Sequence, residues 1–258
     1  MPRKVSHPKL KQVFLVILVF ILATGFWEWA VRAKEISELI LPGPLKIGER
    51  FVALLHTTAF WGNFGVTMYE VLAGYALGIV IAVILGVAIS QLRILEQSLM
   101  PYVVAFQTIP SIALAPIFLH WFGYGLTSKI VMAAIISFFP ILVNVIVGLQ
   151  ASNSEQIEML RSFGASSMQI LLKVRVPNAM PYLFAGLNLG AVFALVGAIV
   201  AEFVGGASGL GKMILQFNDT MKIADMFAVL IVLAIIGMSM HCIIACIRRK
   251  VIFWAATR

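Results

Sequence analysis

The chain alternates long apolar runs with short polar segments. Six of the runs are long enough to cross a bilayer, which takes about 20 apolar residues in a helix. The runs are continuous rather than alternating, so they predict helices and not the strands of a membrane barrel. We therefore expect an all-α, polytopic membrane protein with six spans, over about residues 12–31, 66–90, 100–121, 129–149, 182–204 and 226–247.

The composition supports an integral membrane protein. Hydrophobic residues make up 61% of the chain and charged residues 12%, with a mean hydropathy of +1.01, whereas a soluble domain is typically about 45–50% apolar and about 25% charged. The net charge of +8 fits Lys and Arg gathered in cytoplasmic loops rather than a nucleic-acid partner. With six spans and a cytoplasmic N-terminus, most basic residues fall on the inner side, so both termini are expected in the cytoplasm.

The N-terminal run also resembles a signal peptide, because a basic segment precedes an apolar core. Ala23-Thr24-Gly25 is a poor cleavage site, however, and the tryptophans at 27 and 29 are typical of an interfacial anchor. We therefore favour an uncleaved first span. The expected organisation is a basic cytoplasmic N-terminus (1–11), a single membrane domain (12–250) and a cytoplasmic tail (251–258).

The segment between the first two spans is more polar. The turn Pro42-Gly43-Pro44 ends any helix there, and residues 45–60 have amphipathic spacing, which predicts an interfacial helix. The second span carries a small residue at every fourth position, which predicts close approach of a neighbouring helix. These small residues are Gly74, Gly78, Ala82, Gly86 and Ser90. Glu70, near the outer end of this span, is expected to be a solvated carboxylate at the interface.

The third span contains three prolines, at positions 101, 110 and 116. Prolines free backbone carbonyls, and polar side chains are costly in lipid, so this span is expected to face the protein interior or a water-filled path. A kink satisfied by neighbouring helices explains the pattern equally well. The polar residues of spans three to five are candidates for lining a solute pathway: Gln107, Thr108, Ser111, Ser137, Asn144 and Asn188.

One motif imitates a phosphate-binding loop. Gly206-Ala-Ser-Gly-Leu-Gly211-Lys212 matches the first seven positions of a P-loop, but Met213 follows where a magnesium-binding hydroxyl is required. The stretch also follows a membrane span rather than a strand, and the expected topology places it outside the cell. We therefore predict no ATP site in this chain. The four histidines are scattered, and Cys242 and Cys246 are interpreted as small apolar residues on one helix face, so no catalytic group, metal site or cofactor is expected.

The polar segment 151–181 has the pattern of a folded loop. Residues 155–163 predict a helix with Ile157, Leu160 and Phe163 along one side, ended by Gly164 in a left-handed C-cap. Ser166, followed by Gln169 three positions later, is a capping-box signature for a second helix through about residue 175, which Pro177 is expected to end. Such a cytoplasmic helix–turn–helix suits docking of a soluble partner, and an interfacial hairpin without a partner is the alternative.

This segment resembles the EAA loop of ABC-importer permeases of the binding-protein-dependent family. Glu158, Gly164, Val174, Val176 and Pro177 stand at the spacings of that pattern, with Met159 and Leu160 in place of its two alanines. Other stretches resemble the branch that carries nitrate, sulfonates, taurine and pyrimidine precursors. They are 107–116, 121–125, 138–142, and 201–204 with 209–211. The resemblance covers the chain from about residue 40 to its end.

The resemblance implies a type I importer permease in the bacterial inner membrane that is not itself an enzyme. It implies a second permease copy (a homodimer), two ATPase subunits and a periplasmic solute-binding protein as partners. The residues expected to couple the loop to the ATPase are Glu158, Gly164, Ala165, Ser166 and Pro177. Two alternatives stay open, which are a secondary transporter acting alone and a membrane scaffold that recruits a soluble protein. The sequence does not identify the solute.

Overall fold

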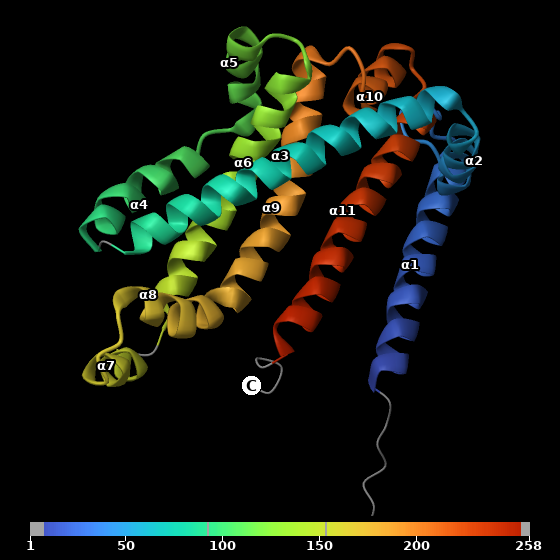
Figure 1. The fold of residues 1–258 in the computed structure, drawn as a ribbon. Helices are drawn as coiled ribbons and strands as arrows, with labels where there is room; N and C mark the ends of the chain where they lie inside the picture. The colour runs from blue at the N-terminus through green and yellow to red at the C-terminus, as the bar shows by residue number, and fades with distance from the viewer. Residues whose placement is uncertain (1–7, 92, 153, 254–258) are drawn as a thin grey trace, which may run out of the picture. The chain divides into compact units, whose positions relative to one another are not determined.

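The structure is a computed structural model, and it describes residues 8–91, 93–152 and 154–253. All regular secondary structure in these ranges is helical, which confirms the all-α prediction (Figure 1). In chain order, the helices are α1 (Pro8–Ala33), α2 (Pro44–Leu55), α3 (Thr58–Ser90), α4 (Arg93–Gln107), α5 (Ser111–Phe122), α6 (Leu126–Gln150), α7 (Ser154–Ser162), α8 (Ser167–Ile170), the π-helix η1 (Leu171–Arg175), α9 (Val176–Gly205), α10 (Leu210–Asp219) and α11 (Ile223–Val251).

The third span is broken. Among the described residues, five helices are long and apolar enough to cross a membrane, and α4 with α5 forms a sixth span if this bent pair is counted as one. The two helices meet at 99°. The break has a local cause, because Pro110 has no N–H to donate and disfavours helical geometry at the residue before it. The third apolar run is therefore two short helices, a larger break than a kink within one helix.

The segment before the second span differs from the prediction. The amphipathic helix α2 ends at Leu55, and α3 begins at Thr58, well before the expected start near residue 66. Between them, both the N–H and the hydroxyl of Thr57 donate to the carbonyl of Leu54, at 3.0 and 2.8 Å, which closes the last turn of α2. Because α3 begins earlier than expected, Glu70 lies well inside this helix and not near its start.

The chain forms two compact units. The first comprises residues up to Phe60 together with Ile214–Ile231. In this unit the Glu28 carboxylate of α1 accepts a hydrogen bond from the N–H of Leu45 at 3.2 Å and pairs with Arg32 at 2.6 Å. A carboxylate at the start of α2 compensates the free N–H groups and positive dipole end of that helix.

The second unit comprises Trp61–Met213 and the chain from Val232 onward. Its centre is the pair α6 and α9, which pack side by side along most of their lengths (Figure 1). A Cβ added at Gly74 or Gly78 of α3 would lie 2.5 Å from Ala133 or Ser137 of α6, so these glycines let the helices touch. The predicted small-residue stripe therefore packs on α6. Lipid is as apolar as the side chains, so the gain is van der Waals contact at close range.

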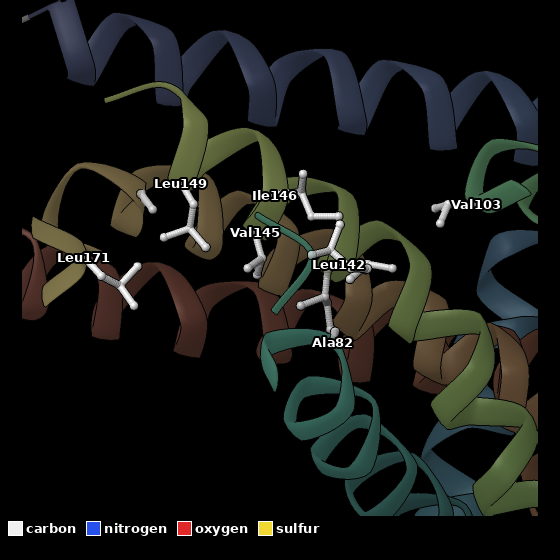
Figure 2. Packing of buried hydrophobic residues seen from close by; sticks show 10 residues of the cluster. Ala82, Val103, Leu142, Val145, Ile146, Leu149 and Leu171 are labelled. Atoms are coloured by element: carbon white, nitrogen blue, oxygen red, sulfur yellow. The ribbon is translucent and has the colours of Figure 1, made fainter. Parts of the chain in front are cut away.

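An apolar cluster fills the second unit (Figure 2). Figure 2 shows Ala82 of α3 next to Leu142 of α6, with Val145 and Leu149 following along α6 and Leu171 of η1 beyond them. These side chains are all at most 8% exposed. The cluster continues to η1, so the helices that would cross the bilayer and the polar loop that follows α6 share one packed core.

The region between the last two spans also contains an element that the sequence reading missed. Residues 205–225 were expected to be a loop, but α10 forms within them. Gly209, with φ +116°, reverses the chain just before this helix. The left-handed backbone at Gly209 suits glycine alone, and the turn brings the start of α10 against the end of α9.

Candidate functional site

The polar loop forms two short helices at the end of α9 opposite α5 (Figure 1). No residue of α7 is buried within the described part of the chain. Ile157 and Leu160 are half-buried, whereas Phe163 is 79% exposed. The predicted apolar side of the first helix is therefore only partly turned inward, and its last residue lies open to a partner.

The turn after α7 has the predicted left-handed conformation. Gly164 has φ +78°, its N–H donates to Arg161 O at 2.9 Å, and the N–H of Ala165 donates to Leu160 O at 3.0 Å. These two bonds make a Schellman motif, which satisfies carbonyls that the helix end would leave free. A Cβ at Gly164 would meet nothing within 4 Å. The glycine is therefore required by backbone conformation and not by space.

The predicted capping box is confirmed. The N–H of Gln169 donates to Ser166 Oγ at 3.3 Å, and the N–H of Ser166 donates to Gln169 Oε1 at 2.8 Å. Two N–H groups at the start of α8 are thereby satisfied reciprocally. The loop is held by local bonds at both of its turns, which makes it a defined surface.

The prediction that Pro177 ends the second helix is wrong. The helix after Ser166 changes to a π-turn, in which the N–H of Val176 donates to Leu171 O, and α9 then begins at Val176. Proline has no N–H, but in the first turn of a helix no partner is needed for one. Ser167–Gly205 is therefore one continuous helical path of 39 residues. The loop joins the fifth span without a flexible link.

Apolar side chains project from this loop. We call the exposed residues of α7, α8, η1 and the turn after α7 the loop surface: Met159 (53% exposed), Phe163 (79%), Met168 (62%) and Leu172 (59%). Glu158 and Arg161 lie exposed on the same segment. Methionine and phenylalanine on short, fixed helices are suited to filling a groove in another protein.

The predicted pathway residues do not converge on one point. Gln107 lies exposed at the end of α4 and lines a cavity with Pro140 of α6. The Thr108 hydroxyl donates to Ala105 O at 2.7 Å, and Asn144 Nδ2 donates to Pro140 O at 2.8 Å. Neither Asn144 nor Asn188 lines the cavity of Gln107.

The other pathway candidates are Asn188, Ser111 and Ser137. The Oδ1 atom of Asn188 is buried and has no hydrogen-bond partner among the described residues. Ser111 opens α5, but its side chain lies outside the described part of the structure. The Ser137 hydroxyl donates to Ala134 O at 3.0 Å within its own helix, which is a packing role.

A buried charge cluster lies in the second unit, and the sequence reading missed it. Glu70 was expected to be solvated, but it is 0% exposed, and its Oε1 lies 3.1 Å from Nζ of Lys129, which is also buried. The expectation fails because α3 begins at Thr58, about three turns before Glu70. Neither oxygen of Glu70 has a hydrogen-bond partner within the described residues. The contact is therefore an ion pair without well-aligned hydrogen bonds.

Glu202, the third member of the cluster, is also 0% exposed. Its Oε1 accepts from the Thr67 hydroxyl at 2.6 Å, and its Oε2 accepts from the N–H of Gly211 at 2.5 Å. We call Glu70, Lys129 and Glu202 the charge cluster. Its members come from α3, α6 and α9, so the cluster ties three helices of this unit together.

The P-loop-like stretch wraps around Glu202. Three N–H groups of the stretch donate to side chains of the same chain: Gly211 to Glu202, Leu210 to Thr67 Oγ1 at 2.8 Å, and Gly209 to Asn63 Oδ1 at 2.6 Å. A Cβ at Gly209 would collide with the Glu202 carboxylate. The glycines that imitate a phosphate site therefore serve a carboxylate of the same chain.

No group of three or more His, Cys, Asp or Glu side chains that could hold a metal ion occurs among the described residues. The charge cluster has only two carboxylates, and a lysine stands where a cation would be needed. Its chemistry is that of an internal ion pair.

Comparison with known proteins gives a consistent picture. Residues 74–253 match the family model described as "Binding-protein-dependent transport system inner membrane component". The riboflavin transport system permease protein RibX of Chloroflexus aurantiacus is 37% identical, over 90% of this chain and 87% of its own length. The formylaminopyrimidine transport permease protein ThiX of Halalkalibacterium halodurans is 34% identical (85% and 88%), and the putative aliphatic sulfonates transport permease protein SsuC of Bacillus subtilis is 30% identical (89% and 83%).

A solved structure shares the fold. A chain of the MetNI methionine ABC transporter, in an inward-facing conformation, superposes with a TM-score of 0.63 at 25% identity. The match covers 72% of this chain and 92% of that chain.

Proposed function

Because the chain belongs to the family of binding-protein-dependent transport system inner membrane components, we propose how its loop and spans divide the work of import. The chain is the permease subunit of an ATP-driven ABC importer, a multi-pass membrane protein that forms the translocation pathway for a small solute. It is not itself an enzyme, since ATP is hydrolysed by a separate subunit. The proposals below concern the residues and the assembly.

The loop surface is the docking site for the ATPase subunit. The observation that carries this proposal is a set of exposed apolar side chains on two capped helices, such as Phe163 at 79% exposed. Glu158 lies exposed beside them and contacts the partner. Gly164, Ala165 and Ser166 form the turn between the helices and keep their angle. Pro177 lies at the junction with the fifth span.

The assembly we propose contains two copies of this chain and two ATPase subunits in the bacterial inner membrane. A periplasmic solute-binding protein delivers the solute to the outer face. The basic residues near the ends of the chain support a cytoplasmic location for both termini, on the same side as the loop. Domain limits at 1–11, 12–250 and 251–258 follow from this topology.

Closure of the ATPase dimer moves the loop, and α9 moves with it because no flexible segment separates them. The spans then alternate between inward-open and outward-open arrangements. Gln107, Thr108, Ser111, Asn144 and Asn188 are proposed to contact the solute or the water around it. The break between α4 and α5 supports this, because irregular helices within a membrane recur where a polar path is lined by protein.

The relatives' names offer two chemical classes of solute. RibX and ThiX are named for riboflavin and a formylaminopyrimidine, and SsuC is named for aliphatic sulfonates. We propose that the solute of this importer belongs to one of these two classes, which are heteroaromatic compounds and small sulfonates.

Co-expression with the ATPase and uptake in cells test the docking proposal. Gly164→Pro forces a negative φ where the turn needs +78° and removes the N–H that binds Arg161 O. We expect this variant to reach the membrane in normal amount and to lose ATP-dependent uptake. Gly125→Pro is the matched control, because Gly125 already has φ −81°, close to the value that proline requires. Normal uptake by Gly164→Pro would contradict the coupling role.

A second measurement separates this proposal from a transporter that acts alone. The purified chain without ATPase is reconstituted in liposomes and tested for solute flux. Flux in the absence of the ATPase would favour the stand-alone transporter, and a complex that binds the ATPase without any uptake would favour the scaffold.

A further inference from the structure

A cavity lies at the break of the third span, lined by Gln107 at the end of α4 and by Pro140 inside α6. Its volume is about 160 Å³, roughly ten times what one water molecule needs. The cavity, which we call the ring cavity, is lined by Phe106, Gln107, Ile109, Leu114, Ile135, Ile136, Phe139, Pro140 and Phe193. It is therefore built from α4, the break, α5, α6 and α9.

Aromatic rings form the walls. Phe106 and Phe139 are stacked, with ring centroids 5.8 Å apart and planes inclined by 12°. Phe106 is 55% exposed and Phe193 is 43% exposed, so the chain does not fully cover either of these lining residues. Aromatic rings prefer offset-stacked or edge-to-face partners at such spacings, which gives the walls a preference for flat guests.

Polar groups are few and uncharged. The amide of Gln107 is the one polar side chain among the described residues that line the cavity. A backbone acceptor is added by Pro140, which has no N–H and so leaves the carbonyl of Ile136 without its helical donor. The carbonyl of Pro140 itself is already taken by Asn144 Nδ2 at 2.8 Å. The ring cavity thus offers an amide and a free carbonyl between rings, and no charge.

This chemistry decides between the two proposed solute classes. An anion moved out of water without a cationic partner or several donors is strongly disfavoured. A sulfonate would find neither in the lining. A planar ring with nitrogen donors and acceptors would stack on the phenylalanines and bond to the amide and the carbonyl.

We propose that the ring cavity holds the solute during passage, and that this solute carries an uncharged, planar nitrogen-heteroaromatic ring. The inference rests on the proposed function, since it names the substrate class of the same pathway. It makes Phe139 and Gln107 specificity-determining residues.

The test uses the complete complex of permease, ATPase and binding protein reconstituted in liposomes, with riboflavin, a formylaminopyrimidine and methanesulfonate as probes. We expect ATP-dependent uptake of a heteroaromatic probe and none of methanesulfonate. Phe139→Leu removes the ring but keeps apolar bulk, and we expect about tenfold slower uptake, the loss of one ring contact. Phe139→Tyr keeps the ring and should retain uptake. ATP hydrolysis and complex assembly should be unchanged in both variants.

Matched controls keep the outcomes separate. Phe26→Leu, an exposed ring of α1 that does not line the cavity, should leave uptake unchanged. Gln107→Leu should slow heteroaromatic uptake, because it removes the only side-chain amide of the described lining. Uptake of methanesulfonate alone, or Phe139→Leu uptake equal to that of Phe26→Leu, would overturn this inference alone. If no solute is taken up and no ATPase binds, the proposed function is overturned, and this inference with it.

Discussion

The loop that carries the loop surface and the turn that surrounds the charge cluster each place charged side chains near a glycine at positive φ, but in opposite surroundings. Gly164 has φ +78° with open space around it, and Gly209 has φ +116° against the Glu202 carboxylate. The charged groups of the loop, such as Glu158 and Arg161, lie exposed, whereas those of the charge cluster are buried and contact groups of the same chain. A polar segment in a membrane protein therefore indicates a binding surface only once its exposure to solvent is known.

The largest expected effect comes from breaking the charge cluster. Lys129→Met leaves Glu70 and Glu202 buried without a cation, and removing one partner of a buried ion pair costs about 3–5 kcal/mol. Equilibrium unfolding in mixed micelles measures the loss, with a lower yield of folded protein. Adding Glu70→Gln to Lys129→Met removes one of the uncompensated charges and should recover part of the stability. Equal stability of Lys129→Met and the unsubstituted chain would show that the ion pair does not contribute to the stability of the fold.

The two glycines allow a direct comparison. Gly164→Ala should cost about 1–2 kcal/mol, the penalty for a left-handed residue with a side chain. Gly209→Ala adds overpacking against the Glu202 carboxylate, which costs about 1–3 kcal/mol more. Unfolding in mixed micelles should rank Gly209→Ala below Gly164→Ala in stability, and Gly125→Ala, at negative φ in open space, should be neutral. The reverse ranking would contradict the contact between Gly209 and Glu202.

A smaller effect is expected at the capping box. Ser166→Ala removes the side-chain acceptor for the N–H of Gln169, and loss of such a cap costs about 1 kcal/mol. The readout is hydrogen exchange of the Gln169 amide, which should become faster, while the free energy of global unfolding falls by no more than this amount. Ser167→Ala, one position later and outside the box, is the control. Unchanged exchange at Gln169 would mean that the cap does not hold this turn in solution.

The smallest effect on stability should accompany a large effect on assembly. Phe163→Ser alters an exposed side chain, so its stability should stay within about 0.5 kcal/mol of the unsubstituted chain. Because the ring belongs to the loop surface, co-purification of the ATPase should fall. Ile40→Ser, equally exposed at 75% but outside the loop, should leave co-purification intact. Equal recovery of the ATPase with both variants would show that Phe163 does not contribute to the interface.

The turns of the loop could be predicted from local sequence patterns. The charge cluster could not, because it depends on contacts between residues far apart in the sequence. Gly164 and the Ser166–Gln169 box were predictable because their bonds join residues at most five apart in sequence. The role of Pro177 was not predictable, because a proline is compatible both with the end of one helix and with the first turn of the next. Glu70 and Lys129 are paired only through tertiary structure, which periodicity does not report.

A signal for the cluster was nevertheless present. Glu70 follows the start of one apolar run, Lys129 begins another and Glu202 ends a third, so alternating topology puts all three on the same side. Assigning charged residues by their depth in the membrane, and not by loop, would have placed Glu70, Lys129 and Glu202 at the same level. The ring cavity had a weaker signal, since Gln107 was predicted to be a pathway residue but the cavity lining comes from four helices far apart in the sequence.

The charge cluster also has a consequence for biogenesis. Glu70 enters the membrane on α3 before Lys129 of α6 has been synthesised. The acceptor of the Thr67 hydroxyl, Glu202, lies 135 residues later in the chain. An intramembrane carboxylate raises the insertion free energy by about 2.5–3.5 kcal/mol at the helix centre, and the apolar length of α3 has to offset this on its own. A nascent chain that stops before α6 therefore leaves an unpaired charge in the bilayer. The residues that join three helices in the finished protein are thus uncompensated in the truncated chain.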